Sequence, residues 1–391
     1  MTPVSFDPGD AAFPHKATSL FAALRTNCPV LRHGSDRWPF FSVFTYHDVA
    51  NALSDWKTWS SEIPAIRDLV LGDAAVMIHD DPPNHEKYRC LLHSLTKGHT
   101  MREDIRRVVD AALSAHMNRD VEFVEGVAGR ISLSVICQII GIPESDAGYL
   151  RDWTNRLSAA VGCEFIETAQ DALDSQQSRV TDLHEELTLY LRCLTLDAKR
   201  CLSSGLVKES LTWPVSESER LGLLKSIAFA GNHTSTILQT NAIWLLATHG
   251  PQFGRLKRHE VGAVCAAKEV LRYKSPFRGV TRIAKHCGEI RGVPYYRGDY
   301  LLAWIASANR DNMEFTDPDA FDVGRSPNRH LSYGVGLHYC VGAHLASQQL
   351  ECVIEWLSLH VAAIDLLGVP EVIPDPWVDG FSKLEVRLVS G

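Results

Sequence analysis

Apolar residues recur at helical spacing along most of this chain. Where they fall at i, i+3, i+4 and i+7, they share one face and predict a helix. The longest such run, 217–248, opens after Ser216 or Ser218 with acidic residues in its first turn and stops before Gly250-Pro251. The predicted helices span residues 84–95, 102–118, 127–140, 144–160, 178–202, 217–248, 258–273 and 341–359.

Strand signals are fewer and shorter than the helical ones. Runs that fit strands, with turn residues between them, cover residues 39–44, 279–284, 288–293, 299–304 and 383–389. Helices and strands do not alternate regularly, which argues against a doubly wound sheet or a barrel. The predicted fold class is therefore mainly α with small β-sheets, in a single domain over residues 1–391.

Composition and charge narrow the class of protein. The chain has 391 residues, 45% hydrophobic and 22% charged, as in soluble globular proteins. A formal net charge of -8 argues against a general nucleic-acid binder. Arg102, Arg106 and Arg107 form a local cationic group, either a solvated helix face or a basic patch. No secretory signal and no run of about 18 apolar residues is found, so a cytoplasmic protein without a membrane span is expected.

Cys340 differs from the rest of the ten scattered cysteines, most of which we expect to be small buried apolar residues. It lies among three glycines, just before the predicted helix 341–359. A helix N-terminus favours a thiolate through its dipole and its free N–H groups. Taken alone, Cys340 fits an inert buried residue, a metal ligand beside His338 and His344, or a thiolate facing a flat ligand. The metal site has no evident fourth ligand and does not explain the glycines.

The stretch from Tyr333 to Gly342 resembles the haem-binding loop of the cytochrome P450 family. The matching positions are Gly334, Gly336, His338, Cys340 and Gly342, with Tyr333 where the family usually has phenylalanine. The resemblance extends from about residue 13 to residue 388 and is strongest from 226 to 346. It implies a cytochrome P450 fold and a haem b whose iron is bound by Cys340.

Three small or hydroxylated residues share one face of the helix 217–248: Ala230, Gly231 and Thr234. Alone, such a patch more often marks close helix packing. Under the family resemblance it is the oxygen-binding segment, with Thr234 as a catalytic residue. His233 stands where the family usually has an acid, and three roles stay open for it: relaying protons, bonding the substrate, or serving a reaction that depends less on the relay.

Cationic residues along the chain match the family's pattern for binding haem carboxylates. His85 and Arg89 are i, i+4 on one predicted helix, so both are expected to reach the same anion. The resemblance adds Arg282 and His338 as further donors to the two carboxylates. After this helix the family commonly has a Phe-Thr-Pro turn, whereas residues 95–99 depart from it.

Glu269 and Arg272 are i, i+3 on a predicted helix. By itself this spacing is common and indicates a surface ion pair that contributes little to stability. The resemblance instead implies a structural network that supports the haem side of the core, with Arg325 as its third member.

The function implied by the resemblance is that of a monomeric haem-thiolate monooxygenase, using O2 and electrons from a ferredoxin and its reductase. Arg102, Arg106 and Arg107 are candidates for the docking patch. Segments 61–80, 155–180, 276–280 and 378–381 are expected to contribute to the substrate pocket. Its candidate lining residues are Phe229, Asn232, Phe277, Val280 and Phe381.

Three reactions or roles remain open at this stage. The first is hydroxylation of a small natural product in secondary metabolism. The second is oxidative cross-linking of aromatic groups, for example in a short peptide, which His233 slightly favours because coupling inserts no oxygen. The third is a haem sensor or carrier without turnover, against which the presence of Thr234 argues.

Overall fold

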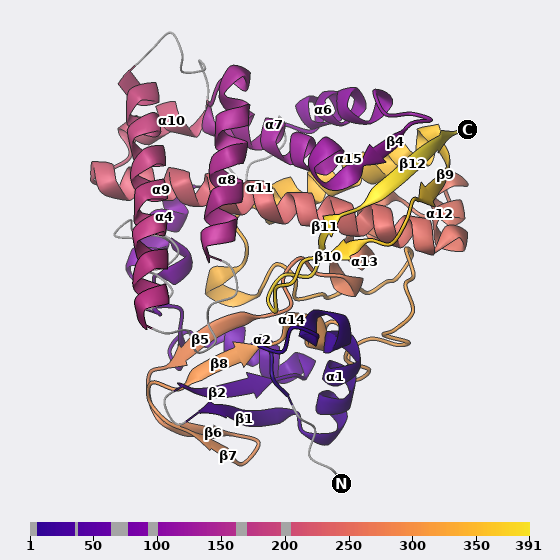
Figure 1. Cartoon of the computed structure of the whole chain (residues 1–391). Helices are drawn as coiled ribbons and strands as arrows, with labels where there is room; N and C mark the ends of the chain where they lie inside the picture. Colours follow the sequence, from indigo (N-terminus) through magenta and orange to yellow (C-terminus); the bar gives the residue numbers. More distant parts are fainter. Residues whose placement is uncertain (1–5, 36–37, 64–76, 93–100, 162–169, 197–204) are drawn as a thin grey trace.

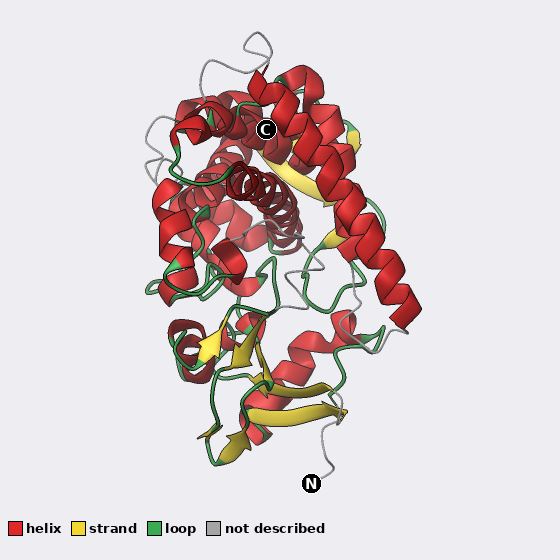
Figure 2. Ribbon diagram, turned by 90° about the vertical axis from the view of Figure 1, so that its left-hand side faces the viewer, coloured by secondary structure: helices red, strands yellow, loops and turns green. Residues whose placement is uncertain are grey.

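The computed structural model describes residues 6–35, 38–63, 77–92, 101–161, 170–196 and 205–391. Helices gather toward one end of the molecule, and the largest sheet lies toward the other (Figures 1 and 2). The helices are α1 (Phe13–Asn27), α2 (Tyr46–Ser54), α4 (Asn84–Leu91), α6 (Arg102–Ser114), α7 (Gly129–Ile140), α8 (Ala147–Val161), α9 (Gln170–Leu196), α10 (Leu206–Glu209), α11 (Glu217–Thr248), α12 (Gly250–Lys257), α13 (Ala263–Tyr273), α14 (Ile305–Ala308) and α15 (Ala343–His360).

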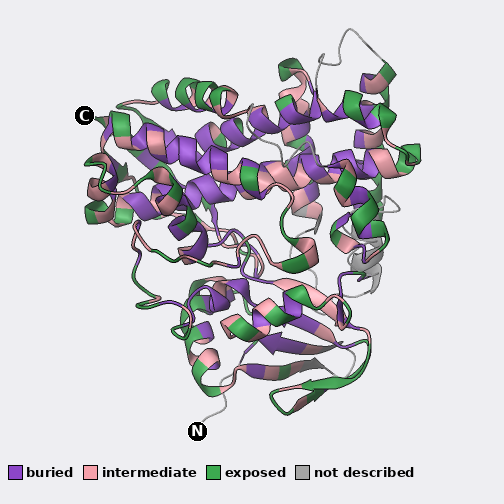
Figure 3. Ribbon diagram, turned by 180° about the vertical axis from the view of Figure 1, so that it is seen from behind, coloured by how far each residue is buried: buried purple, intermediate pink, exposed green. Residues whose placement is uncertain are grey.

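Helix α11 runs through the middle of the helical part and packs against α7, α8, α9, α13 and α15. It starts with a capping box, in which the Ser216 hydroxyl accepts from the Glu219 N–H and the Glu219 carboxylate accepts from the Ser216 N–H. Most of its residues are buried, and purple prevails along the long central helices of Figure 3. A helix packed against other elements on several sides buries most of its surface, and the polar side chains that α11 buries, such as Asn232 and Asn241, bond to neighbouring segments.

The largest sheet has five strands in the order β1-β2-β8-β5-β3. Its members are β1 (Val30–Ser35), β2 (Trp38–Val43), β3 (Trp59–Ser60), β5 (Val280–Ala284) and β8 (Tyr300–Ala303). Strands β2 and β8 are parallel and the other pairs antiparallel. Smaller sheets join β4 (Asp120–Glu122), β9 (Val361–Leu366) and β12 (Glu385–Ser390), pair β6 (Gly288–Ile290) with β7 (Val293–Tyr295), and pair β10 (Glu371–Val372) with β11 (Phe381–Lys383).

The predicted fold class, mainly α with small β-sheets, is confirmed, and α11 has the predicted bounds. Three local predictions are wrong. Gly250-Pro251 was expected to be a turn, yet α12 begins there, because proline suits the first turn of a helix, where its missing N–H costs nothing. The predicted helix 258–273 starts only at Ala263, since His259 has a left-handed φ of 56° that interrupts the helix. Helices α1 and α2 were not predicted.

The third wrong prediction is the single strand over 288–293. This range contains β6 (Gly288–Ile290), a turn with left-handed φ angles of 51° at Arg291 and 76° at Gly292, and the start of the antiparallel β7 at Val293. Other predicted elements differ only at their ends. The helix predicted over 178–202 begins earlier, at Gln170, and its last residues lie outside the described part of the chain, as do the unusual residues 95–99. The pocket segments 61–80 and 155–180 are described only in part. Within the described residues, no helix combines the length and the apolar character that crossing a membrane requires.

Candidate active site

The loop before α15 has a shape that its glycines make possible. Gly334 and Gly336 adopt left-handed φ angles of 70° and 75°. A Cβ at Gly336 would also lie 2.9 Å from the Cα of Ser54, so residue 336 needs glycine for two reasons. The loop closes with the Cys340 N–H donating to the Tyr333 carbonyl at 2.8 Å, and α15 follows at Ala343.

The Cys340 side chain is exposed to solvent, although protein atoms surround it closely enough that burial raises the pKa of its thiol. A hydrogen bond from the Gly342 backbone and the positive charge of Arg89 oppose this shift and favour the thiolate. A thiol with a raised pKa loses its proton when a metal ion binds the sulfur. Cys340 is therefore accessible to a ligand, its thiol has a raised pKa, and the Gly342 N–H and Arg89 lie where they favour its thiolate.

Three groups that can carry positive charge converge near Cys340: His85 on α4, Arg282 on β5 and His338 in the cysteine loop. The His85 and His338 rings lie 4.5 Å apart between centroids. Burial and the charge of Arg89 lower the pKa of His85 to about 4, while burial, Arg282 and His85 lower the pKa of His338 to about 3. Burial also lowers the pKa of Arg282 to about 10.

Three histidine ring nitrogens in this cluster lack hydrogen-bond partners in the part of the chain that the structure describes. Neither ring nitrogen of His85 has a hydrogen-bond partner there, and Nε2 of His338 has none either. The nearby Asp81 carboxylate is already engaged by the Ser60 hydroxyl at 2.7 Å and the Lys285 ammonium at 2.5 Å. A ligand carrying carboxylates would supply the missing acceptors. The residues thus fit the two carboxylates of a haem.

Arg89, one turn after His85 on α4, contacts the cysteine loop. Its Nη1 donates to the Tyr339 carbonyl at 2.7 Å, directly before Cys340. Helix α4 therefore contributes His85 to the cluster with Arg282 and His338, and it contacts the cysteine loop through Arg89.

On the small-residue face of α11, Thr234 bonds within the helix and Gly231 packs against α7. The Thr234 hydroxyl donates to the Ala230 carbonyl at 2.6 Å, one turn earlier in the same helix. A Cβ on Gly231 would lie 2.3 Å from Cδ1 of Ile136 on α7. Glycine at 231 is therefore required for the close approach of α11 and α7, which is the packing interpretation that the sequence left open.

His233 is partly exposed, and its ring lies parallel to that of Phe229, one turn away, with centroids 6.1 Å apart and an interplanar angle of 8°. Burial lowers the pKa of His233, and the charge of Asp375 opposes the shift only in part. The imidazole is thus neutral at neutral pH, with one nitrogen that donates and one that accepts.

Two of the expected pocket residues face elsewhere. Asn232 is buried and donates to the Thr154 hydroxyl of α8 at 3.0 Å, so it joins two helices. Phe381 is buried against Trp244 of α11 and belongs to the core. Phe277 is exposed and Val280 partly so, which leaves both accessible to a ligand.

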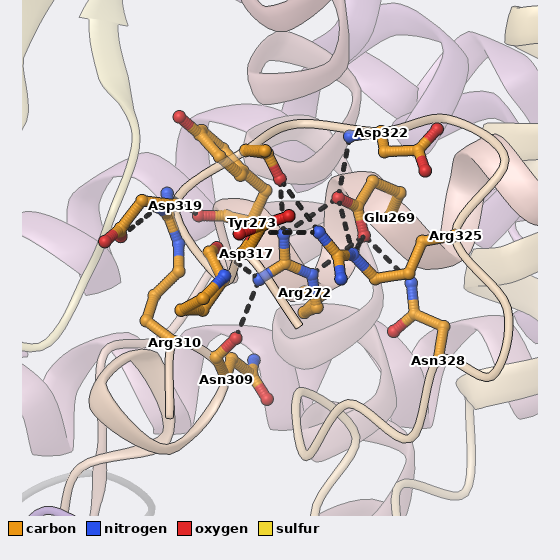
Figure 4. A network of polar contacts seen from close by, with 12 residues as sticks. Glu269, Arg272, Tyr273, Asn309, Arg310, Asp317, Asp319, Asp322, Arg325 and Asn328 are labelled. Atoms are coloured by element: carbon orange, nitrogen blue, oxygen red, sulfur yellow. Dashed lines mark hydrogen bonds and ion pairs between the residues drawn. The ribbon is translucent and has the colours of Figure 1, made fainter. Parts of the chain in front are cut away.

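Glu269 and Arg272 form a fully buried ion pair and not the surface pair that their spacing alone suggests (Figure 4). Arg272 donates from Nε and Nη2 to the two Glu269 oxygens, both at 2.8 Å. Arg325 donates to the same carboxylate at 3.2 Å. Arg272 further donates to the backbone carbonyls of Asn309, Pro318 and Ala320.

Asn309 connects this network to the cysteine loop, a role that spacing in the sequence did not reveal. Its side-chain oxygen accepts from the Leu331 N–H at 2.8 Å, and its amide donates to the Ser332 hydroxyl at 2.9 Å. Since Arg272 holds the Asn309 carbonyl at 2.9 Å, the ion pair supports the start of the loop that ends in Cys340.

The three arginines of α6 are engaged by carboxylates and do not form an unpaired basic patch. Arg102 contacts Glu351 at 2.7 Å and also Glu355, and Arg106 contacts Glu355 at 3.3 Å. Arg107 pairs with Asp104 on the same helix. Across the described residues, no group of three or more His, Cys, Asp or Glu side chains is arranged to hold a metal ion, so the small-metal interpretation of Cys340 finds no ligand set.

Both the family model and the relatives that this chain matches are described as cytochrome P450. The family model described as Cytochrome P450 matches residues 264–360, which include the Glu269–Arg272 pair and Cys340. The chain is 28% identical to Cytochrome P450 109 of Bacillus spizizenii, over 94% of this chain and 91% of that protein. It is also 28% identical to Cytochrome P450 119 of Sulfolobus acidocaldarius, over 95% and 98% of the two chains.

Solved structures agree over nearly the full length. The structure of CYP109E1 from Bacillus megaterium in complex with testosterone superimposes with a TM-score of 0.86 at 26% identity, covering 97% of this chain and 99% of that one. The crystal structure of CalO2 superimposes with a TM-score of 0.88 at 23% identity, covering 100% of both chains.

Proposed function

Because this chain belongs to the cytochrome P450 family of oxidoreductases, we propose that it is a haem-thiolate monooxygenase that hydroxylates a small organic substrate in natural-product biosynthesis. The observation that carries the proposal is the set of unpartnered donors on His85 and His338 beside an accessible Cys340. A relative named Erythromycin C-12 hydroxylase, from Saccharopolyspora erythraea, is 28% identical over 82% of this chain and supports hydroxylation.

Cys340 is the proposed ligand of the iron of haem b, and His85, His338 and Arg282 are the proposed partners of its carboxylates. When bound, haem activates O2 with two electrons so that one oxygen atom can enter the substrate. The Gly342 N–H and the charge of Arg89 stabilise the thiolate of Cys340. Unpaired buried donors are costly, so the cluster gains stability when carboxylates fill it.

On the opposite side, Thr234 and His233 are the proposed catalytic residues. Thr234 is partly exposed, and its hydroxyl donates its proton to the Ala230 carbonyl. His233 is neutral and has one acceptor nitrogen and one N–H, so it can take up one proton and release another. It thereby replaces the acid that usually precedes this threonine.

We further propose that residues 1–391 form a single cytochrome P450 domain that acts as a cytoplasmic monomer and receives electrons from a ferredoxin and its reductase. Matches that cover 94% and 95% of the chain support the single domain. The ion-paired arginines of α6 leave the docking surface for the ferredoxin unassigned.

Oxidative coupling of two aromatic groups is the second candidate reaction. The observation that favours it is the neutral His233 in place of an acid, because coupling removes two hydrogen atoms and inserts no oxygen. The mass of the product separates the two reactions. Hydroxylation adds one oxygen atom, whereas coupling removes two hydrogens.

A carbon monoxide spectrum of the reduced protein tests the thiolate assignment. The wild-type protein is expected to show the red-shifted band of thiolate ligation, and Cys340→Ala to lose it. The matched control Cys193→Ala, at an exposed cysteine on α9, is expected to keep the band. A histidine-type spectrum in the wild-type protein, or an unchanged band in Cys340→Ala, would contradict the proposal.

A further inference from the structure

A buried group of charges lies where the segment after α13 meets the segment between β10 and β11. Arg278 is 2% exposed, and its Nη2 donates to Asp379 Oδ1 at 2.9 Å. Lys274 contacts the same oxygen at 2.5 Å. The two cations lower the pKa of Asp379 although burial opposes them, so the carboxylate is ionised. Asp379 lies 101 positions after Arg278 and 105 positions after Lys274 along the chain.

Arg278 also holds the backbone of the second segment. Its Nη1 donates to the Asp375 carbonyl at 2.8 Å and to the Val378 carbonyl. Its own N–H donates to the Trp377 carbonyl at 2.6 Å. An isolated β-bridge pairs Phe277 with Val378. A planar guanidinium with several donors suits this task, because it can serve two carbonyls and a carboxylate at once.

The segment held by Arg278 is rigid in itself. The Asp375 carboxylate accepts from the N–H groups of Trp377 and Val378, at 2.6 Å and 3.0 Å, which closes a tight turn. The Trp377 ring stacks on that of Trp304, with centroids 5.3 Å apart. Because the turn is internally bonded, the two hydrogen bonds from Arg278 to its carbonyls set the position of the whole turn.

The same segment is packed onto α11 close to the proposed catalytic residues. Asn241 of α11 donates to the Asp379 carbonyl at 2.7 Å. A Cβ on Gly380 would lie 2.7 Å from Cγ2 of Ile237, which is one turn after Thr234. In addition, the Asp375 charge acts on the His233 imidazole. Figure 1 shows β10 and β11 below α11, on the side of the five-stranded sheet.

We propose that Arg278 is a positioning residue that determines the size of ligand the site admits, because it fixes Phe277, Asp375 and Val378 relative to the face of α11 that carries His233. The inference rests on the proposed function, in which the substrate lies on the His233 side of the haem. Arg278 touches neither the substrate nor the cofactor in this scheme. It acts through the two segments that it joins.

Two haem ligands of different size test this role without a known substrate. Imidazole reaches the iron and little else, whereas 4-phenylimidazole extends toward the walls of the site. In spectral titrations of the holoenzyme, Arg278→Met is expected to change the Kd of 4-phenylimidazole about tenfold, the discrimination that a shift of one methylene in a pocket wall gives. The Kd of imidazole is expected to stay within about twofold, because imidazole does not extend to the walls whose position Arg278 fixes.

Arg278→Lys keeps the positive charge but cannot serve both carbonyls and the carboxylate, so an intermediate change for 4-phenylimidazole is expected. Arg258→Met, which removes an exposed arginine that contacts Glu260, should leave both Kd values unchanged. Equal shifts for both azoles, or no shift for either, would overturn the inference. If Arg278→Met does not fold, the ratio of the two Kd values in Arg278→Lys decides, and a wild-type ratio there counts against Arg278.

The carbon monoxide band of each variant checks the proposed function separately. That band reports ligation by Cys340 and not the position of the wall. A thiolate band together with unchanged azole selectivity would reject the inference and keep the proposed function. A missing thiolate band in the wild-type protein would reject the function itself.

Discussion

Replacing Arg272 by methionine removes the cation from a fully buried ion pair. Glu269 and Arg272 are both 0% exposed at the side chain. In the variant, Glu269 keeps the Arg325 guanidinium at 3.2 Å and the Asn328 amide at 3.0 Å, but it loses two bonds of 2.8 Å. The carbonyls of Asn309 and Pro318 lose the donor that Arg272 supplies, whereas the Ala320 carbonyl keeps the Arg325 guanidinium at 3.2 Å.

The expected cost is a large part of the stability of the fold. Removing one partner of a buried ion pair costs about 3–5 kcal/mol. A buried carbonyl left without a donor costs about 1–3 kcal/mol, and these costs do not simply add. A total of at least about 5 kcal/mol is of the same order as the free energy of unfolding of a whole domain, about 5–15 kcal/mol. Arg272→Met is therefore expected to yield little folded protein.

Thermal unfolding followed by circular dichroism measures the effect, with haem content as a second measurement. The double variant Glu269→Gln/Arg272→Met is expected to be less destabilised than Arg272→Met, because it removes the buried carboxylate that would otherwise have lost its two bonds from Arg272. The control Arg156→Met removes an exposed ion pair with Glu186, for which a change of about 0–1 kcal/mol is expected. If Arg272→Met melts with the wild-type protein, the reasoning from burial is refuted.

Three further predictions concern other titratable groups. His233→Ala is expected to divert more of the electrons to hydrogen peroxide, measured as peroxide per NADH consumed; unchanged coupling with weaker substrate binding would assign His233 to recognition. Lys225 is buried, and burial lowers its pKa to about 8, although its ammonium donates to the Thr188 hydroxyl at 3.0 Å. Because the buried ammonium is charged at pH 7 at a cost in free energy, Lys225→Met is expected to raise the free energy of unfolding at pH 7 by about 1–3 kcal/mol. A lower melting temperature would contradict this. His33 has a pKa lowered by burial from 6.5 to about 4, so its contribution is complete above pH 6.5 and is lost as the pH falls toward 4. His33→Gln should therefore lose less stability over that range in parallel melts at several pH values, and an unchanged pH profile would exclude His33 as a contributor.

The sequence by itself determined those features whose cause is local. The capping box at Ser216 and Glu219 and the apolar residues that follow it are enough to place α11. The glycines at 334 and 336 indicate backbone conformations that residues with a side chain rarely adopt, and both have left-handed φ angles in the structure. Residues close together in the sequence determine helix caps, turns and hydrophobic periodicity, so these features can be predicted from the amino-acid sequence alone.

Only the tertiary structure decided whether a local pattern is buried or exposed and what it faces. The i, i+3 spacing of Glu269 and Arg272 is the same for a weak surface pair and for a buried network, and packing of the segment 309–328 made it the latter. Gly231 faces Ile136 because α7 approaches α11 there. Arg278 and Asp379 meet although 101 positions separate them. Burial and long-range contact follow from how the whole chain packs, and no window of sequence contains that information.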